Sequence, residues 1–165
     1  MKKFSRRKIF LILIGLILVL AGGRFVWMKR GIPFVSRRTQ WTIGIYRSNS
    51  PFHFNKLQGW INPLFRAEDV SDVDANFVAD PFLIKDGSAW DLFFEVYNNK
   101  TKQGDLAFAT SKNTWTWHYQ KVIIDEPFHL SYPHVFKADD GYYLIPESYQ
   151  DHSIRLYKAD SFPTH

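Results

Sequence analysis

Cysteine is absent from the 165 residues of the sequence, and acidic residues are absent from its first 38. Without cysteine the chain forms no disulfide bond, no cysteine-ligated metal site and no lipid anchor of the lipoprotein type. Residues 1–38 hold 10 Lys and Arg, which leaves 11 Lys and Arg against 16 Asp and Glu in residues 39–165. The overall charge of +5 therefore comes from the N-terminal segment. The mildly acidic remainder offers no basic patch, so no nucleic-acid partner is expected.

Aromatic residues, by contrast, are abundant and make up 18% of the chain. They lie mainly in short runs of strand type, where they fill the core of a β-sheet. Some of them can instead line a sugar site, because flat rings stack on the apolar faces of sugars.

An apolar segment follows a basic one at the N-terminus. Residues 1–8 carry five Lys and Arg, and residues 9–28 are mostly apolar, interrupted by Arg24. Twenty such positions match the thickness of a bilayer, so the sequence predicts a transmembrane signal anchor over residues 9–28, with the lipid bilayer as partner. The basic residues ahead of it favour a cytoplasmic N-terminus. The chain is then a single-pass membrane protein with its C-terminal domain outside the cytoplasm.

A cleavable signal peptide is the alternative, since residues 21–23 (Ala-Gly-Gly) offer small side chains for cleavage. The apolar stretch resumes after Arg24 and no Ala-x-Ala site is present, which favours the anchor. A basic linker is expected over residues 29–40, and residues 41–165 form the folded domain.

One pattern occurs twice in this domain. Residues 79–95 and 131–147 align without a gap at an offset of 52 residues. The alignment pairs Pro81 with Pro133, Lys85 with Lys137, Trp90 with Tyr142, Leu92 with Leu144 and Glu95 with Glu147. Each copy has two short apolar runs around an Asp-Gly turn, as in a β-hairpin. A repeat near 50 residues that is made of short strands is typical of a β-propeller.

Further strands complete the first copy. Strands are expected over residues 41–47, 81–84, 90–97, 104–111 and 115–124, and then over 132–138, 142–147 and 153–159. Residues 81–124 form one four-stranded antiparallel blade, and its second strand is apolar on both faces because blades pack face to face. The second unit lacks its fourth strand. Since a propeller needs at least three repeats, the chain is either a fragment of a longer protein or completed by blades of an oligomer. The sequence thus predicts an all-β fold, a partial β-propeller preceded by one N-terminal transmembrane helix.

Several rare strings occur in an order that resembles a known family. They are Ala79-Asp-Pro-Phe, Gln103-Gly-Asp, His129-Leu-Ser-Tyr-Pro-His-Val-Phe136 and Ile145-Pro-Glu-Ser148. Over roughly residues 60–165 the chain resembles the N-terminal domain of the glucosamine inositolphosphorylceramide transferase family. That domain is similar to the propellers of family 43 glycoside hydrolases, so the resemblance implies a truncated five-bladed β-propeller. In plant members glycosyl transfer is attributed to a separate C-terminal domain without counterpart here, so the resemblance implies a fold and not that activity.

The same resemblance implies two catalytic candidates. Asp80 resembles an inner-strand Asp of family 43 propellers, and Glu147 resembles their general acid. Glycoside hydrolysis uses two carboxyl groups on either side of the scissile bond. An Asp before Pro is also a common turn residue, and the strand expected over residues 41–47 contains no acid to act as the base.

Substrate-binding candidates are Glu95, His129, Tyr132 and His134. His134 stands where the first copy has Phe82, which indicates a polar position facing the propeller channel and able to bind a sugar hydroxyl. A hydrogen-bonded core histidine is the alternative. Two histidines without a carboxylate partner in register do not indicate a metal site, so no metal and no cofactor are expected.

The expected function is that of a membrane-anchored, extracytoplasmic carbohydrate-recognition or accessory propeller, with a carbohydrate or a glycolipid as ligand. One alternative is a glycoside hydrolase of the family 43 type that uses Asp80 and Glu147. Another is an inactive fragment.

Overall fold

The computed structural model describes residues 6–30, 41–50, 52–55, 59 and 61–164. The chain divides into two compact units, Met1–Arg38 and Thr39–His165. Of the expected basic linker over 29–40, only residues 29 and 30 lie among the described residues. Of the basic segment 1–8, the first five residues lie outside them.

The described part of the first unit is one helix, α1 (Arg6–Arg30). It covers the segment that the sequence predicts as an apolar helix, which is rich in Leu and Ile and free of proline. Across the described parts of the chain, no helix is long and apolar enough to cross a membrane. The prediction of a transmembrane anchor over residues 9–28 is therefore not supported.

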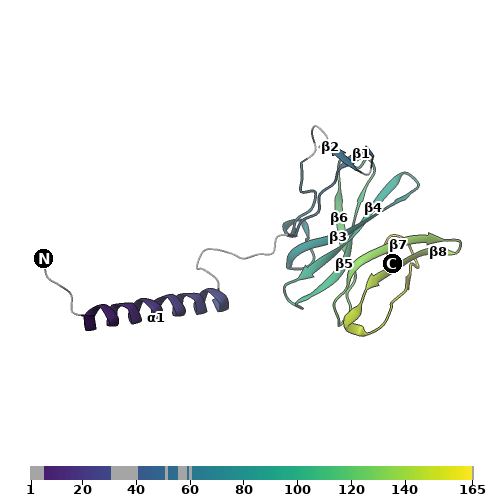
Figure 1. The fold of residues 1–165 in the computed structure, drawn as a ribbon. Coiled ribbons are helices and arrows are strands. Elements are labelled where there is room, and N and C mark those ends of the chain that lie inside the picture. The colour runs from purple at the N-terminus through teal and green to yellow at the C-terminus, as the bar shows by residue number, and fades with distance from the viewer. Residues whose placement is uncertain (1–5, 31–40, 51, 56–58, 60, 165) are drawn as a thin grey trace. The chain divides into compact units, whose positions relative to one another are not determined.

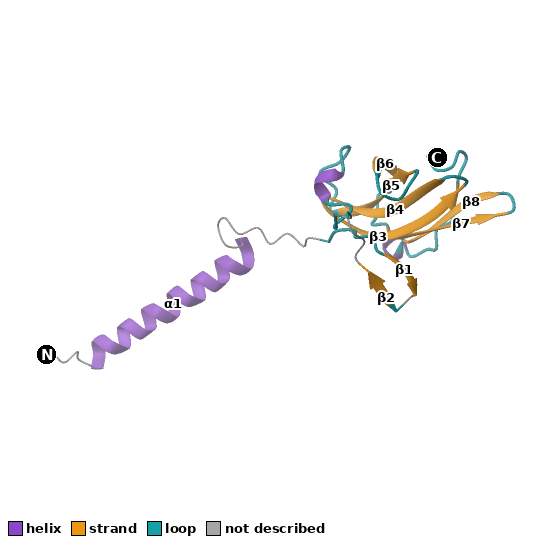
Figure 2. Ribbon diagram, turned by 90° about the horizontal axis from the view of Figure 1, so that it is seen from above, coloured by secondary structure: helices purple, strands orange, loops and turns teal. Residues whose placement is uncertain are grey.

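The second unit is built of antiparallel strands, as the sequence predicts (Figures 1 and 2). A four-stranded sheet has the order β3-β4-β5-β6, and a three-stranded sheet has the order β7-β8-β9. The bounds are β3 (Ala75–Asp86), β4 (Ala89–Asn98), β5 (Gln103–Ser111), β6 (His118–Ile124), β7 (Ser131–Ala138), β8 (Gly141–Glu147) and β9 (Tyr157–Lys158). Strands that follow each other in sequence are neighbours in each sheet, as expected for propeller blades. The number of blades stays a prediction.

The internal repeat is present in the strand register as well as in the sequence. A β-bulge lies between Ala79 and Phe82 of β3, and another between Ser131 and His134 of β7. These positions are again 52 residues apart. A bulge places one extra residue in its strand and redirects the side chains around it.

Strand β4 is buried on both faces. Phe93 belongs to a cluster with Phe108 and Leu144, the last of which lies on β8. The next residue, Phe94, points the other way and stacks on Phe65, with ring centroids 5.4 Å apart. Since successive side chains of a strand point to opposite faces, β4 is covered on both sides by other parts of the domain. This agrees with the prediction of a second strand that is apolar on both faces.

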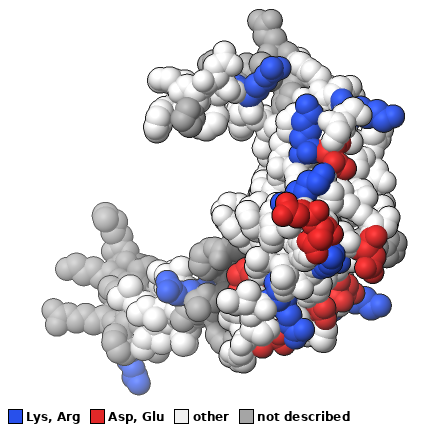
Figure 3. Space-filling view, turned by 90° about the vertical axis from the view of Figure 1, so that its right-hand side faces the viewer, with Lys and Arg blue, Asp and Glu red and all other residues white. Residues whose placement is uncertain are grey.

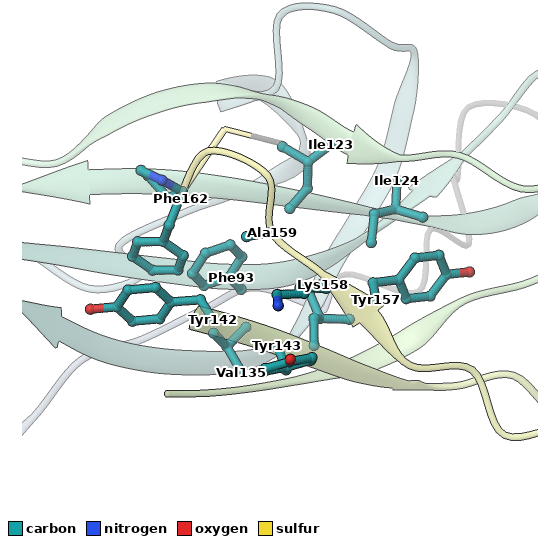
Figure 4. A pocket seen from close by; sticks show the side chains of 12 residues that line it. Phe93, Ile123, Ile124, Val135, Tyr142, Tyr143, Tyr157, Lys158, Ala159 and Phe162 are labelled. Carbon is teal, nitrogen blue, oxygen red and sulfur yellow. The ribbon is translucent and has the colours of Figure 1, made fainter. Parts of the chain in front are cut away.

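The interface between the two sheets is apolar, and Figure 4 shows it from close by. Phe162 contacts Phe93 and Tyr142, with ring centroids 5.9 Å and 3.7 Å away. These rings line a cavity of about 70 Å³ together with Ile123 and other apolar residues. Lys158 is the one charged residue in its lining. This cavity is a packing space of the core and not a polar site.

The strand expected over residues 41–47 is wrong in extent. In the structure it is reduced to one bridge, between Ile43 and Phe65. A short hairpin of β1 (Arg47–Ser50) and β2 (His53–Asn55) follows it. The alternating pattern of residues 41–47 therefore reflects the burial of single side chains such as Ile43, and not a paired strand.

The strand expected over residues 153–159 includes only Tyr157–Lys158. A 3₁₀ turn (Tyr149–Asp151) and His152, at a φ of 52°, come before it. Ile154 is 87% exposed, because the chain after this turn pairs with β8 only at its end.

We expect Phe65→Ala to lower the free energy of unfolding by about 3–5 kcal/mol, since a large buried ring leaves a cavity. Phe65 is 4% exposed and ties the segment before β3 to Phe94. Phe52 is 85% exposed and provides the matched control, whose change to Ala should alter stability by at most about 0.5 kcal/mol. Urea denaturation measures both. Equal small losses for the two variants would show that the segment before β3 is not part of the core.

Candidate functional site

Two strained backbone positions mark the region of interest. Asp80 and Tyr132 lie inside the two bulges and have φ angles of 50° and 51°. A non-glycine residue in this region costs about 1–3 kcal/mol and persists only where the surrounding structure holds it. Their strands, β3 and β7, contact each other and lie side by side in Figures 1 and 2. The repeat therefore places residues of different chemistry at equivalent positions of two neighbouring strands.

Glu95 is the centre of the carboxylate group found there. It lies on β4, pairs with Ala79 across the sheet and is only 5% exposed. Its carboxyl group is in hydrogen-bond contact with that of Asp80 and close to that of Glu147. Burial, then the charge and hydrogen bond of Asp80, and then the charge of Glu147 raise the pKa of Glu95 to about 7. Glu95 is therefore a carboxyl group that holds a proton in part at neutral pH.

A cleft of about 410 Å³ opens beside this pair of carboxyl groups. Its walls include Trp41, Phe77, Asp80 and Glu95. Trp41 is 62% exposed, and its carbonyl accepts a hydrogen bond of 3.5 Å from the N–H of Val78 in β3. The cleft therefore combines exposed aromatic surface with carboxyl groups.

His129 closes the other side of Glu95. The N–H of Gly104 donates a 2.8 Å hydrogen bond to His129 Nδ1, so the proton of the neutral ring is on Nε2. His129 Nε2 is 3.6 Å from Glu95 Oε1, which is beyond hydrogen-bond distance. A side chain at Gly104 has no room, because its Cβ would lie 2.3 Å from the carbonyl oxygen of Leu130 and 2.7 Å from Glu95 Oε1.

Glu147 is held by its own hydrogen bonds. Ser131 Oγ donates to Glu147 Oε2 at 3.1 Å, and the N–H of Tyr149 donates to Glu147 Oε1 at 2.8 Å. Glu147 affects Glu95 through its charge and not through a hydrogen bond. The carboxyl group in contact with Asp80 is thus that of Glu95, and catalysis by Asp80 and Glu147 stays a prediction.

Tyr132 and His134 form a separate group around Phe82. The Phe82 ring meets Tyr132 and His134 edge to face, with centroids 4.7 Å and 5.5 Å away. His134 also stacks on Phe136 at 5.8 Å. Both residues are exposed, Tyr132 by 58%. Neither of them lines the cleft beside Asp80, so their predicted contact with a substrate stays a prediction.

The structure brings together four of the six predicted site residues, namely Asp80, Glu95, His129 and Glu147. Trp41, Phe77 and Gly104 also lie at this site and were not predicted from the sequence. The string Gln103-Gly-Asp contained a signal for Gly104, because a glycine inside a strand marks a close approach of other atoms. Trp41 gave no such signal, since exposed and buried aromatic residues look alike in sequence.

A second group of acids lies away from this site. Asp105 is fully buried on β5 and accepts a 2.9 Å hydrogen bond from Asn98 Nδ2. Burial and the neighbouring carboxyl group of Asp125 raise its pKa to about 6, although the Asn98 hydrogen bond opposes them. Asp72 accepts hydrogen bonds from the Tyr119 hydroxyl (2.5 Å) and the Val122 N–H (2.7 Å), which tie the segment before β3 to β6.

Among the residues that the structure describes, no three His, Asp or Glu side chains are placed to hold a metal ion.

On the face shown in Figure 3, Lys and Arg side chains lie among Asp and Glu side chains. No continuous basic patch is visible on this face.

Comparison with known proteins shows that most of the chain matches one family. The model of the family described as "Glucosamine inositolphosphorylceramide transferase 1, N-terminal" matches residues 36–165. Proteins named glucosamine inositolphosphorylceramide transferase 1 from Oryza sativa subsp. japonica and from Arabidopsis thaliana are 36% and 34% identical over 138 residues. These alignments cover 74% of this chain but 18% of the length of each relative.

Among solved structures, the chain is similar to the GH32 β-fructofuranosidase of Bombyx mori. That enzyme alone gives a TM-score of 0.47 with 20% identity, over 61% of this chain and 22% of the enzyme. A variant in complex with sucrose gives 0.45 with 20% identity, over 56% and 19%.

Gly104→Ala should destabilise the domain by several kcal/mol, because the new Cβ meets backbone and not only flexible side chains. Gly44→Ala provides the control, since a Cβ there has its nearest atom at an ordinary 3.5 Å. Thermal unfolding of both variants measures the difference. A Gly104→Ala protein as stable as Gly44→Ala would contradict the close packing around Glu95.

Glu95→Gln should make stability less dependent on pH. The pKa of Glu95 is raised from 4.5 to about 7. The stability gained by binding this proton is therefore fully present below about pH 4.5 and is lost as the pH rises through 7. Between pH 5 and pH 8 the free energy of unfolding should fall less in the variant than in the wild type, by about 2.5 kcal/mol. Urea denaturation at several pH values measures this. Exposed Glu68, changed to Gln, should keep the wild-type dependence, and an unchanged slope in Glu95→Gln would contradict the raised pKa.

Proposed function

The chain belongs to the family of the glucosamine inositolphosphorylceramide transferase 1 N-terminal domain, and from this membership we propose that it is a carbohydrate-recognition or accessory domain of propeller type. The ligand we propose is a carbohydrate or the sugar headgroup of a glycolipid. The relatives are named for glucosamine and inositolphosphorylceramide, but the chain spans only 18% of their length. The proposal therefore concerns binding of a sugar and not the transfer reaction of those proteins.

The observation that carries the proposal is the cleft between Trp41 and the carboxyl groups of Asp80 and Glu95. Small-molecule sites typically measure about 300–1,000 Å³ and combine apolar walls with a few polar groups. An exposed Trp ring offers the apolar face of a sugar a flat surface, and carboxyl groups accept hydrogen bonds from its hydroxyls. The strained φ of Asp80 supports a role in binding, because strain of this kind clusters at functional sites.

A further repeat unit is the second partner we propose, from the same polypeptide or from another one. Phe93 of the first copy corresponds to Ile145 of the second, and Phe93 is covered by the β7-β8-β9 sheet. On the second copy, Phe136 and Tyr143 stack at 5.7 Å on the same face as Ile145, and all three are half-buried. A third unit that packs on this face as the second packs on the first completes the burial. The position of the domain outside the cytoplasm also remains a proposal.

Glycoside hydrolysis is the second candidate function. The raised pKa of Glu95 favours it, since a carboxyl group that is protonated at neutral pH can act as a general acid. The contact between Asp80 and Glu95 opposes it, because the two carboxyl groups of glycosidases are about 5–9.5 Å apart to admit the substrate or water. Hydrolysis would therefore require Asp80 and Glu147 as the two groups, which is the pair predicted from the sequence. We prefer recognition for this reason.

The proposal is tested by titrating the domain with a panel of monosaccharides and glycolipid headgroups. Calorimetry measures binding, and product analysis detects hydrolysis. We expect saturable binding without product, and Trp41→Ala should weaken it about tenfold through loss of the stacking surface. Trp115→Ala is the matched control, since Trp115 is 53% exposed but does not line the cleft. Absence of binding to every sugar, or equal effects of the two variants, would refute recognition at this cleft. Product formation that Glu147→Gln abolishes would support hydrolysis instead.

A further inference from the structure

The cleft of the candidate site continues into a second hollow, which is called its extension below. The extension has a volume of about 430 Å³, and it is lined by Thr42, Gly44, Tyr46, Asn62 and Pro63. Thr42 and Gly44 also line the cleft, so the two hollows meet at these residues and form one groove. Each hollow alone lies within the range of about 300–1,000 Å³ that is typical of small-molecule sites. The groove therefore has room for more than one sugar unit.

The chain segment where the two hollows meet is paired along one edge only. Ile43 N–H donates a 3.0 Å hydrogen bond to the Phe65 carbonyl, and the Ile43 carbonyl accepts one of 3.2 Å from the Phe65 N–H. Ile45 N–H donates to Asn62 Oδ1 at 3.0 Å, and Asn62 Nδ2 donates to the Ile45 carbonyl at 2.9 Å. In an extended chain the backbone groups of alternate residues point to opposite edges. The backbone groups of the residues next to Ile43 therefore point away from these partners.

The open edge consists of Thr42 and Gly44. Both residues are exposed, and within the part of the chain that the structure describes neither of them forms a hydrogen bond. Each has one backbone N–H donor and one C=O acceptor beside the groove. A hydroxyl group both donates and accepts, so a ligand rich in hydroxyl groups can pair with both kinds of group.

An aromatic ring lies in each part of the groove. Trp41 lines only the cleft, and Tyr46 lines only the extension. Tyr46 is 56% exposed, and its ring lies beside Gly44, where an added Cβ would be 3.6 Å from Tyr46 Cε2. Each ring can thus stack on a different sugar unit. The two rings favour a glycan over a peptide strand, which would be bound mainly through the open backbone edge.

The extension differs from the cleft in charge. The cleft contains the carboxyl groups of Asp80 and Glu95, whereas the described residues that line the extension are all uncharged. A charged sugar unit in the extension would lose part of its hydration without gaining an opposite charge. The unit that the extension suits is therefore neutral.

We propose that the groove binds a linear glycan of at least two units, with one unit stacked on Trp41 and a neutral unit beside Tyr46. This inference rests on the proposed recognition of carbohydrate and adds a second subsite, which sets the length of the ligand. A monosaccharide fills only one of the two hollows. A second unit adds hydrogen bonds to the open edge at Thr42 and Gly44 without displacing the first, so affinity rises from one unit to two.

The test is calorimetric titration of the wild-type chain with glucose, mannose and galactose and with linear disaccharides and trisaccharides of each. In at least one series the disaccharide should bind about tenfold more tightly than its monosaccharide, as two further hydrogen bonds allow. If monosaccharides bind and no series gains affinity with length, the second subsite is refuted while sugar recognition in the cleft stands. If no sugar binds, the inference is refuted together with the proposed function.

Tyr46→Ala should lower the ratio of disaccharide to monosaccharide affinity to about twofold or less, because the stacking surface of the extension is gone. Tyr149→Ala is the matched control, since Tyr149 is 66% exposed and lines neither hollow. It should keep the wild-type ratio. A folded Tyr46→Ala protein that also keeps this ratio contradicts the second subsite.

Gly44→Val tests the junction of the two hollows independently. The backbone there accepts a Cβ, whose nearest atom would be Asn62 Oδ1 at 3.5 Å, and the branched side chain narrows the groove. The affinity ratio should again fall to about twofold or less. Circular dichroism shows whether each variant is folded. If Tyr46→Ala does not fold, an unchanged ratio in Gly44→Val refutes the subsite, and the wild-type length series decides if neither variant folds.

Discussion

Burial of strand β4 on both faces is the constraint from which the site follows. Phe93 and Phe94 pack on opposite sides, and each is almost fully inaccessible to water. Glu95 follows them on the same strand and is buried with them. The large hydrophobic gain of the two rings thus places a carboxyl group where its charge is poorly solvated. A group that is unfavourable for stability by itself is held in place by neighbours that are highly favourable.

The two bulges explain why the copies of the repeat differ in role. Both copies keep the same backbone irregularity, so the residue inside each bulge is directed to the same place relative to its hairpin. The first copy has Asp80 there, which meets Glu95, and the second has Tyr132, which meets Phe82. The same β-bulge therefore carries an acidic residue in the first copy and an aromatic residue in the second. This is how a repeated scaffold can carry a single site.

The sequence predicted those features that depend on local pattern. The repeat at an offset of 52 residues predicted both hairpins, and the apolar run around Phe93 predicted a strand buried on two faces. The contact of Asp80 with Glu95 could not be predicted, because it depends on a bulge and a positive φ that no local residue type requires. The role of Trp41 was missed for a similar reason. It lies in a segment joined to the rest by single backbone contacts, which leave no periodic pattern.

The raised pKa of buried Glu95, next to Asp80, is the property on which the site depends most directly. An NMR titration that follows the side-chain carboxyl carbon of Glu95 measures its pKa in the wild type and in Asp80→Asn. We expect a pKa of about 7 in the wild type and a lower value in the variant, because the Asp80 charge is gone and an amide N–H replaces it. A wild-type pKa near the ordinary value of 4.5, unchanged by Asp80→Asn, would contradict it.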